Sequence, residues 1–577
     1  MPTESAWPGG EVRIPRYARW VLWLIMGLAL GLRLWGIRFG MPYDFTPDEV
    51  HEIMRALKLG AGEYDWDHFG KGGLFLLLFV EYGALYAFWW LTGHVGSPTE
   101  FALQYLLDPT AFYLLGRVTV AIMGALTCLV VYHIGSRIHG WRVGLAAALI
   151  GATAHFHAEW SHYVNVDIGM TLAVWTSILA FLHYEKTNRT KWLAAAGALA
   201  GVAVAFKLPG IVVLIPLGLA LVTPGEKWSE PLRLLKTGAI GLVTMAIALV
   251  VVAPESIPGI RALGWSFAGI LGGPAPAAPV PSEAEIGRAI QEITVMTFGD
   301  YLQILTAPAY LALTVSALIG GIIGCFKRNR WDIIWCVLTM AFLLVMYAAD
   351  RPGSDRYLLP IMPAFWLLAA RAAVAVSGTK LGVTLALIAG IVAAPLFAIS
   401  KQNYMFTRPD TRVLAKSWIE SNAPAGSKIL MDGMRYRYIQ SPPLNPDEAT
   451  VRRRIAIAKK EGADLSRGVS SRTLTLYAEA MARVAGPRYE LHSTVYGLEV
   501  QDLSYYPEAC FQYIVTSSAN SARFNDARVA DRYPRSARFY RDLPNDSRFE
   551  LVYSAEPVDW QIRGPKIAVY KVLESCG

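Results

Sequence analysis

Long runs of apolar residues follow one another along the first 400 residues of the chain. A helix needs about 17–25 predominantly apolar residues to cross roughly 30 Å of hydrocarbon. The runs that approach or reach this length lie near residues 20–38, 113–135, 142–158, 168–184, 192–207, 209–223, 237–253, 302–325, 331–349, 357–376 and 381–400. The pattern predicts a polytopic α-helical membrane domain over residues 1–400, with about 11 transmembrane helices.

The pattern changes near Lys401, where the long apolar runs end. Beyond it, Arg412–Asn422 has the spacing of an amphipathic helix, whereas the short segments Lys428–Met431 and Lys566–Lys571 read as strands. A mixture of short helices and strands is typical of a soluble α/β domain. We therefore expect such a domain over residues 401–577.

The composition agrees with a membrane protein and excludes other classes. Hydrophobic residues make up 54% of the chain and charged residues 17%, against about 45–50% and about 25% in soluble proteins. A disordered chain would not carry 12% aromatic residues. The net charge of +8 comes from short basic clusters between apolar runs, so it indicates membrane topology rather than nucleic-acid binding.

These basic clusters mark the cytoplasmic side of the membrane. The N-terminus is expected in the cytoplasm, because Arg13, Arg16 and Arg19 precede a first helix that has no small-residue cleavage site after it. The segments expected on the outer face are 39–112, 159–167, 207–209, 254–301, 350–356 and everything after 400. We therefore predict a multi-pass protein of the inner (cytoplasmic) membrane with a periplasmic or extracytoplasmic tail.

One apolar stretch, Gly72–Leu91, is predicted not to cross. The basic clusters all fall on the cytoplasmic side only if this stretch is not counted as a span. It would then be a juxtamembrane or re-entrant helix within outer loop 39–112. The alternative, a twelfth span, would place the basic cluster at Arg137 outside and would invert every later loop.

Ionisable side chains at the membrane edge are costly, so each is a candidate functional residue. Those flanked by apolar helix all fall on the predicted outer face. They are Asp48, Glu49, Lys71, Asp167, Lys207 and Arg356. Acids and bases gathered at one face indicate a site that handles a hydroxyl and a phosphate.

The residue types suggest different roles within this set. Asp48 and Glu49 stand at the start of a predicted helix, where the helix dipole alone would favour one acid but does not explain two. Lys71 and Lys207 offer point charges to a phosphate, whereas Arg356 offers a two-pronged guanidinium. Snorkelling to lipid headgroups is the simpler alternative for each cation.

No metal or cofactor is indicated. His155, His157 and His162 lie close together in sequence, but their spacing matches no strong zinc signature. The acid-rich segment Glu63–Asp67 is interpreted as a solvated loop.

The two cysteines of the tail, Cys510 and Cys576, are expected in an oxidising compartment. Each adjoins a predicted strand, Phe511–Thr516 and Lys566–Lys571 respectively. If these strands are neighbours, a disulfide would tie down the end of the chain, and we predict this bond.

Taken together, the motifs resemble those of the lipid-carrier-dependent glycosyltransferases of the type C fold. The resemblance is greatest to glycosyltransferase family 39, with the protein O-mannosyltransferases and the aminoarabinose transferase of lipid A. The motifs that carry it are Thr46-Pro-Asp-Glu49 with the Lys71 turn, Gly116-Arg-Val-Thr, Ser161-His-Tyr-Val-Asn-Val-Asp167, Phe206-Lys-Leu-Pro-Gly210 and Asp355-Arg-Tyr-Leu-Leu-Pro360.

The resemblance implies transfer of a hexose or pentose from a polyprenyl-phosphate carrier to a hydroxyl of a lipid, glycan or protein at the outer face. It implies that Asp48 is the general base of an inverting reaction. Glu49 and Asp167 are further catalytic candidates because of their place at the membrane edge. Independently of the resemblance, a departing lipid phosphate needs cations beside it, and Lys71, Lys207 and Arg356 are expected to supply them, with Tyr357 as a further donor-binding candidate. A non-catalytic assembly subunit with this fold, or a transporter or flippase of lipid-linked sugars, remains an alternative.

Overall fold

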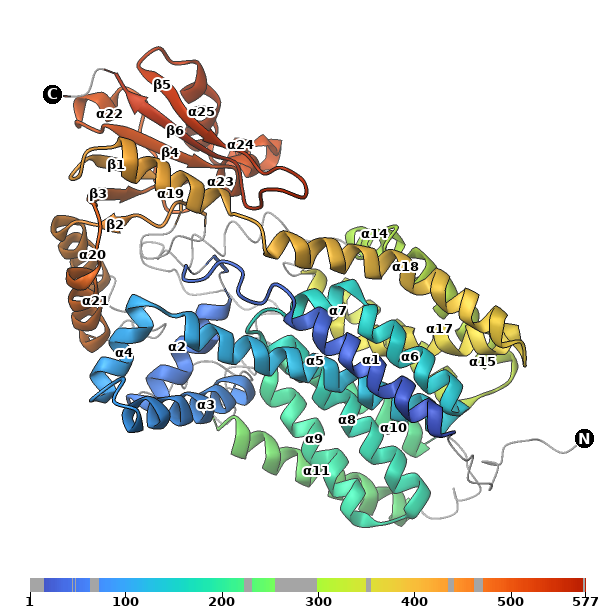
Figure 1. Cartoon of the computed structure of the whole chain (residues 1–577). Coiled ribbons are helices and arrows are strands. Elements are labelled where there is room, and N and C mark those ends of the chain that lie inside the picture. Colours follow the sequence, from blue (N-terminus) through green and yellow to red (C-terminus); the bar gives the residue numbers. More distant parts are fainter. Residues whose placement is uncertain are drawn as a thin grey trace, which may run out of the picture.

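The computed structural model describes residues 15–43, 45–46, 48–62, 72–222, 231–254, 298–348, 354–433, 440–460, 471–573 and 576. The candidate residue Lys71, the loop Glu63–Asp67 and most of the outer segment 254–301 lie outside the described residues. The chain forms a large helical part and, at its C-terminal end, a smaller part built on a sheet (Figure 1).

The helical part takes up most of the chain to Phe406. Its helices are α1 (Arg16–Leu34), α2 (Glu49–Gly60), α3 (Gly72–Leu91), α4 (Pro98–Leu107), α5 (Thr110–His139), α6 (Trp141–Thr153), α7 (His155–Trp160), α8 (Val166–Thr187), α9 (Thr190–Phe206), η1 (Leu208–Val213), α10 (Leu214–Val222), α11 (Pro231–Val252), α14 (Phe298–Thr306), α15 (Leu311–Phe326), α16 (Arg330–Ala348), η2 (Asp355–Ile361), α17 (Met362–Ser377) and α18 (Leu381–Phe406).

The predicted polytopic membrane fold is confirmed. Within the described ranges, 7 helices are long and apolar enough to cross a membrane, or 8 if the sharply bent pair α14 and α15 forms one span. The sequence predicted about 11 spans; the difference arises partly because some predicted runs form shorter apolar helices, such as α6 and α9. By length and composition α3 qualifies as a span, so its expected juxtamembrane position stays a prediction.

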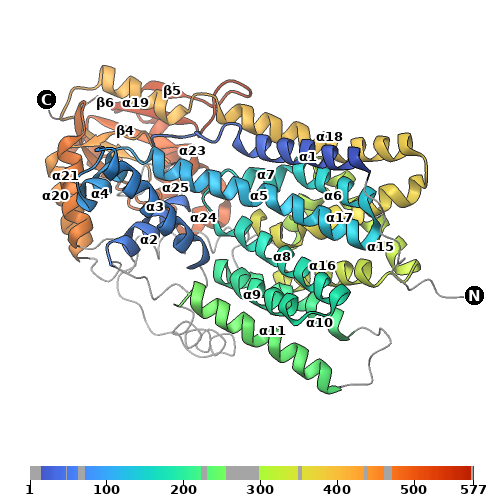
Figure 2. The ribbon, with the colours of Figure 1, turned by 60° about the horizontal axis from the view of Figure 1, so that its bottom comes forward.

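Small residues allow the helices of this part to pack closely. A Cβ atom on Gly144 of α6 would lie 2.6 Å from the carbonyl oxygen of Tyr132 in α5, and one on Gly201 of α9 would lie 2.2 Å from that of Met245 in α11. Both helix pairs are in contact, and α9 lies beside α11 in both views (Figures 1 and 2). Close backbone contact through glycine is a common basis of helix association in membranes.

The tail is a six-stranded sheet with helices around it. The strands lie in the order β2-β3-β1-β4-β6-β5, in which β2, β3, β1 and β4 are parallel and β6 is antiparallel to both of its neighbours. The strands are β1 (Lys428–Met431), β2 (Asn445–Pro446), β3 (Arg488–Ser493), β4 (Tyr513–Ser517), β5 (Phe549–Ala555) and β6 (Ile567–Val572). The helices are α19 (Thr411–Asn422), α20 (Glu448–Lys460), α21 (Ser471–Arg483), α22 (Tyr505–Glu508), α23 (Ser518–Ser521), η4 (Ala522–Asn525), α24 (Ala527–Arg532), α25 (Pro534–Asp542) and η5 (Leu543–Asn545).

Both faces of this sheet are buried. In β1, Ile429 and Met431 join one apolar cluster, while Leu430 between them joins the cluster on the other face. This alternation follows from the two-residue period of a strand. The predicted soluble α/β part is therefore confirmed in its class, and the tail contacts the helical part where α21 packs against α4.

The predicted disulfide between Cys510 and Cys576 is confirmed, with the two Cα atoms 4.9 Å apart. Cys510 precedes β4 and Cys576 follows β6, and these two strands are neighbours in the sheet. The bond therefore connects the end of the chain to the sheet.

Replacing Cys510 by Ser is expected to destabilise the tail by several kcal/mol, at most about 4 in the chain-entropy model, because the unfolded chain regains its freedom. The measurement is the thermal unfolding midpoint of the purified full-length protein. The Cys325→Ser variant removes an exposed free cysteine and should melt like the wild type. Equal midpoints for both variants would contradict a stabilising role of the bond.

A buried carboxyl joins the ends of three parallel strands. Asp432, which follows β1, accepts hydrogen bonds from the Thr494 hydroxyl (2.9 Å), the backbone N–H of Ser517 (2.8 Å) and the Tyr540 hydroxyl. Burial raises the pKa of Asp432 to about 6, although these hydrogen bonds oppose the rise. The loss of solvation of the charged carboxylate therefore has a larger effect on its pKa than the three hydrogen bonds that it accepts.

This raised pKa predicts a pH-dependent stability. A carboxyl whose pKa rises on folding stabilises the protein below its unfolded pKa, and this stabilisation is lost as the pH rises through about 6. We expect the difference in melting temperature between wild type and Asp432→Asn to change between pH 4 and pH 7, by the equivalent of at most about 3 kcal/mol. The exposed-site variant Asp531→Asn serves as the control, and a difference independent of pH would contradict the assignment.

Candidate active site

Two segments far apart in sequence meet at the start of α2. Asp48 directly precedes α2, and its carboxylate accepts a hydrogen bond from Arg356 in η2. The Asp48 side chain makes no capping hydrogen bond to its helix and remains 49% exposed. Helix capping, the simple explanation for an acid at this position, therefore does not account for Asp48.

A second carboxylate, that of Asp167, contacts Arg356 and a further cation, Lys207. Asp167 lies in the first turn of α8, whose start is capped by the side chain of Asn165. The ammonium of Lys207 lies 2.8 Å from Asp167 Oδ1, and Arg356 Nε lies 3.8 Å from Asp167 Oδ2. Asp48, Arg356, Asp167 and Lys207 thus form one continuous row of alternating charge, which we call the charge row.

Aromatic rings support the two cations of the charge row. The Lys207 ammonium lies 4.7 Å from the ring centroid of Tyr357, and the Arg356 guanidinium lies 5.2 Å from that of Trp160. Such cation–π contacts orient a cation without neutralising it. Within the described ranges, the buried Nε of Arg356 and the buried indole nitrogen of Trp160 have no hydrogen-bond partner. Both are donors suited to a bound anion.

Glu49, the neighbour of Asp48, occupies a different environment. Its carboxylate accepts two hydrogen bonds from Arg117, of 2.8 Å and 2.7 Å, and further ones from the backbone of Val164 (2.9 Å) and the hydroxyl of Thr46. It is 1% exposed. These donors occupy both oxygens, so the contacts of Glu49 are those of an anchor between α2 and α5.

Arg117 completes this anchor. It also donates to the carbonyl oxygens of Ile37 (2.8 Å) and Phe39 (2.9 Å) in the segment after α1. The segment that carries Asp48 is thereby held to α5. Arg117 was not predicted as a site residue, although its position inside the apolar run 113–135 was a signal for a functional role.

Another buried arginine positions α7, the short helix that ends at Trp160. Arg33 of α1 donates to the carbonyl oxygens of Gly151 and Ala152, each at 3.2 Å, and lies 2.9 Å from His157 Nδ1. These carbonyls belong to the last turn of α6, where the chain bends into α7. Arg33 satisfies helix-end carbonyls that would otherwise lack partners, so it supports the bend that delivers Trp160 to the charge row.

The structure brings five of the predicted site residues together: Asp48, Asp167, Lys207, Arg356 and Tyr357. It holds Glu49 beside them in its own ion pair, and Lys71 lies outside the described residues. Trp160 and Arg117 belong to the same region and were not predicted. Over the described ranges, no group of three or more His, Cys, Asp or Glu side chains is arranged to hold a metal ion. His162, one of the histidines considered for metal binding, instead contacts the carbonyl oxygens of Ala158 and Trp35.

The cations of the charge row can exchange a carboxylate partner for a bound anion. A bound phosphate would compete with the carboxylates for Lys207 and Arg356, because both cations lie beside carboxylates rather than being locked into backbone contacts. A carboxylate released in this way is free to accept a proton from a hydroxyl.

Comparison with known proteins connects this geometry to a family. Residues 114–257, about a quarter of the chain, match the family described as dolichyl-phosphate-mannose-protein mannosyltransferase. No curated protein sequence matches the chain.

Solved structures extend the similarity along the chain. The oligosaccharyltransferase of Archaeoglobus fulgidus, in complex with Zn and sulfate, is 12% identical with a TM-score of 0.52, covering 93% of this chain and 79% of its own. ArnT from Cupriavidus metallidurans, bound to undecaprenyl phosphate, is 14% identical with a TM-score of 0.49, covering 96% of this chain and 98% of its own. The predicted resemblance to type C glycosyltransferases is confirmed by the family match and the shared fold.

Proposed function

We propose that this chain, which has the fold of the type C glycosyltransferases, transfers a sugar from a polyprenyl-phosphate carrier to a hydroxyl acceptor at the outer face of the membrane. The family match supports a membrane glycosyltransferase with a lipid-phosphate-linked donor. The single observation that carries the finer proposal is the charge row, in which a half-exposed carboxylate, Asp48, adjoins the cations Arg356 and Lys207.

In this proposal the cations bind the phosphate of the donor. Arg356, with its buried Nε, and Lys207 lie where they would stabilise the negative charge that develops on the departing phosphate. The indole N–H of Trp160 is a further donor. The ring of Tyr357, which faces the Lys207 ammonium, helps to orient it.

Asp48 is the proposed general base. The acceptor oxygen forms a bond to the anomeric carbon, the bond from that carbon to the phosphate oxygen breaks, and the hydroxyl proton passes to the Asp48 carboxylate. The polyprenyl phosphate leaves on the opposite side, so the configuration of the sugar inverts. The acceptor oxygen must lie within about 2.6–3.2 Å of Asp48 for this transfer.

Asp167 and Glu49 act as positioning residues in this scheme. Asp167 orients Lys207 and Arg356, since it touches both. Glu49 holds the start of α2, and therefore Asp48, against Arg117 of α5.

The helix ends support the proposed orientation. α8 carries Asp167 in its first turn and Lys186 in its last, and α5 ends with Arg137 and His139. The positive-inside rule assigns those basic ends to the cytoplasm, which leaves the charge row on the outer side of an inner membrane. The disulfide in the tail supports the same orientation, because such bonds persist outside the cytoplasm.

The experiment is release of polyprenyl phosphate by the purified full-length protein, measured by mass spectrometry. The donors are polyprenyl-phosphate-linked hexoses and pentoses, and the acceptors come from a cell-envelope extract. Release that requires both donor and acceptor supports the proposal. Donor that is bound but never consumed would indicate a non-catalytic subunit. Movement of intact donor between vesicle leaflets without release would indicate a flippase, whose charges are expected near the membrane midplane rather than at helix ends.

A further inference from the structure

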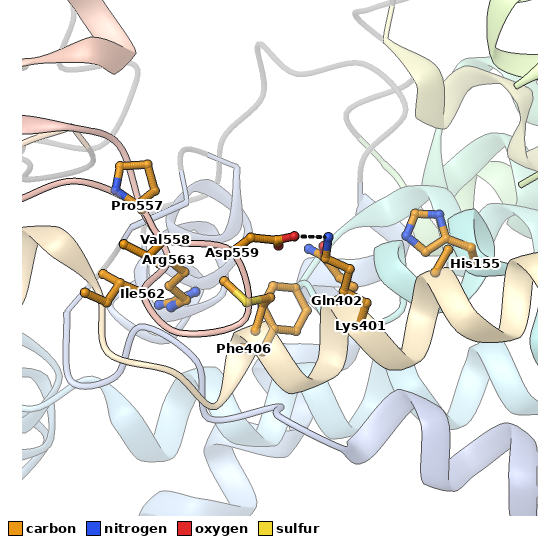
Figure 3. Close-up of a pocket in the computed structure, with 12 residues that line it drawn as sticks. His155, Lys401, Gln402, Phe406, Pro557, Val558, Asp559, Ile562 and Arg563 are labelled. Carbon is orange, nitrogen blue, oxygen red and sulfur yellow. Dashed lines mark hydrogen bonds and ion pairs between the residues drawn. The ribbon is translucent and has the colours of Figure 1, made fainter. Parts of the chain in front are cut away.

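A pocket of about 660 Å³ lies between the last long helix and the tail. One side is formed by Ala398, Lys401, Gln402 and Met405, which share a face of α18, together with Phe406. The other side is the loop between β5 and β6, which contributes Val558, Asp559, Ile562 and Arg563 (Figure 3). No residue of the charge row lines this pocket, so it is a separate feature of the molecule.

Aromatic contacts place the pocket at the level of the membrane surface. The ring of Trp560, in the same loop, lies 5.6 Å from that of Tyr404 and 6.1 Å from that of Phe397, both on α18. Phe397 is 63% exposed on a helix that qualifies as a membrane span. Trp and Tyr gather at the boundary between hydrocarbon and headgroups. The loop therefore contacts the lipid-facing side of α18 near its outer end.

The charges around the pocket are unbalanced. Lys401 pairs with Asp559 at 2.7 Å, and Arg563 pairs with Asp410 at 3.2 Å. Arg408 and Arg412 lie close to Asp410 along the chain, and Arg412 also pairs with Asp410 at 2.7 Å. Burial lowers the pKa of Arg563; the charge of Asp410 opposes this shift and the charge of Arg412 adds to it. The carboxyl of Glu159 also reaches the pocket lining, at 3.4 Å from Gln402 and 3.7 Å from His155. Four cations therefore face three carboxyl groups, Asp559, Asp410 and Glu159, which leaves a small excess of positive charge beside apolar walls.

We propose that the pocket binds the headgroup of an anionic membrane phospholipid. Lys401 and Arg563 contact the phosphate, and the side chains of Met405, Val558 and Ile562 contact the glycerol and the first acyl carbons. The bound lipid ties the β5–β6 loop, and with it the tail, to the outer membrane surface. A phosphate-bearing headgroup fits because it supplies the negative charge that the region lacks, on a molecule that is itself amphipathic.

The test is the binding of phosphatidylglycerol to the purified full-length protein in detergent, measured by native mass spectrometry. Replacing both Lys401 and Arg563 by Gln should weaken binding roughly tenfold or more, because two phosphate contacts are lost. The control Arg528→Gln removes an exposed cation of the tail that does not line the pocket, and it should change binding less than about twofold. Wild-type affinity in the double variant would overturn the proposal.

A second variant guards against misfolding of the double variant, since Arg563 also contacts Asp410. Val558→Asp places a carboxylate in the pocket lining at a residue that is 40% exposed, and it should weaken phosphatidylglycerol binding to a similar extent. Equal affinity for phosphatidylcholine would overturn the proposal in favour of a non-selective lipid contact. Displacement of the lipid by millimolar inorganic phosphate would overturn it in favour of a site for free anions.

Discussion

An Asp48→Asn variant is expected to lose sugar transfer, with kcat reduced by about 10²–10⁴-fold, while it still binds polyprenyl phosphate. The amide has nearly the shape of the carboxylate but cannot take the acceptor proton. Arg356 loses one of its two carboxylate partners in this variant and keeps Asp167, so its contact with the phosphate is not weakened. The measurement combines product formation with lipid binding by native mass spectrometry.

Two companion variants separate the proposed roles. Arg356→Ala should weaken binding of polyprenyl phosphate, because it removes the guanidinium next to both carboxylates. Asp531→Asn, on the tail surface, should leave binding and transfer unchanged. Full transfer activity in Asp48→Asn would rule out Asp48 as the base, even if lipid binding behaved as expected.

Removing one partner of the Glu49–Arg117 pair is expected to destabilise the protein by about 3–5 kcal/mol, because the remaining charge is left buried without its counterion. The exposed fractions of the two side chains are 1% and 2%. We expect Arg117→Met to show a strongly lowered melting temperature in detergent. The corresponding change at an exposed pair, Arg528→Ala beside Asp526, should have little effect, since surface ion pairs contribute about 0–1 kcal/mol.

The double variant Glu49→Gln with Arg117→Met should recover part of the lost stability, because no unpaired charge remains buried. A double variant as unstable as the two single effects added together would contradict a direct pairing. Folded Glu49→Gln protein also distinguishes positioning from catalysis. A positioning role predicts residual transfer with an unchanged pH profile, whereas loss as complete as in Asp48→Asn would make Glu49 a catalytic residue.

Helices and strands that follow from a local pattern of apolar residues were predictable from the sequence. The strand predicted at Lys428–Met431 is β1, and the helix predicted at Arg412–Asn422 is α19 with one residue added. Their periodic patterns reflect burial on faces that are set by strand and helix geometry. The number of membrane spans was less predictable. Apolar composition does not reveal where a run bends, as the chain does between α6 and α7.

The sequence indicated which four charged residues would gather in the charge row, but not how they would pair. The cost of charge at the membrane edge identified Asp48, Asp167, Lys207 and Arg356 from the sequence. Arg356 is separated from Asp48 by 308 positions, and no local pattern specifies which carboxylate it contacts. The contribution of Trp160 was missed because an aromatic residue near an interface has many ordinary roles.

The sequence by itself determined that this protein is a polytopic membrane protein with an α/β tail, and which ionisable residues stand at the ends of its helices. Those properties depend on composition and on periods of a few residues. Only the tertiary structure gave Asp48 and Glu49, which are adjacent in the sequence, different surroundings. One is half exposed beside Arg356 and the other is buried against Arg117, because successive residues at a helix start point in different directions and meet different distant partners.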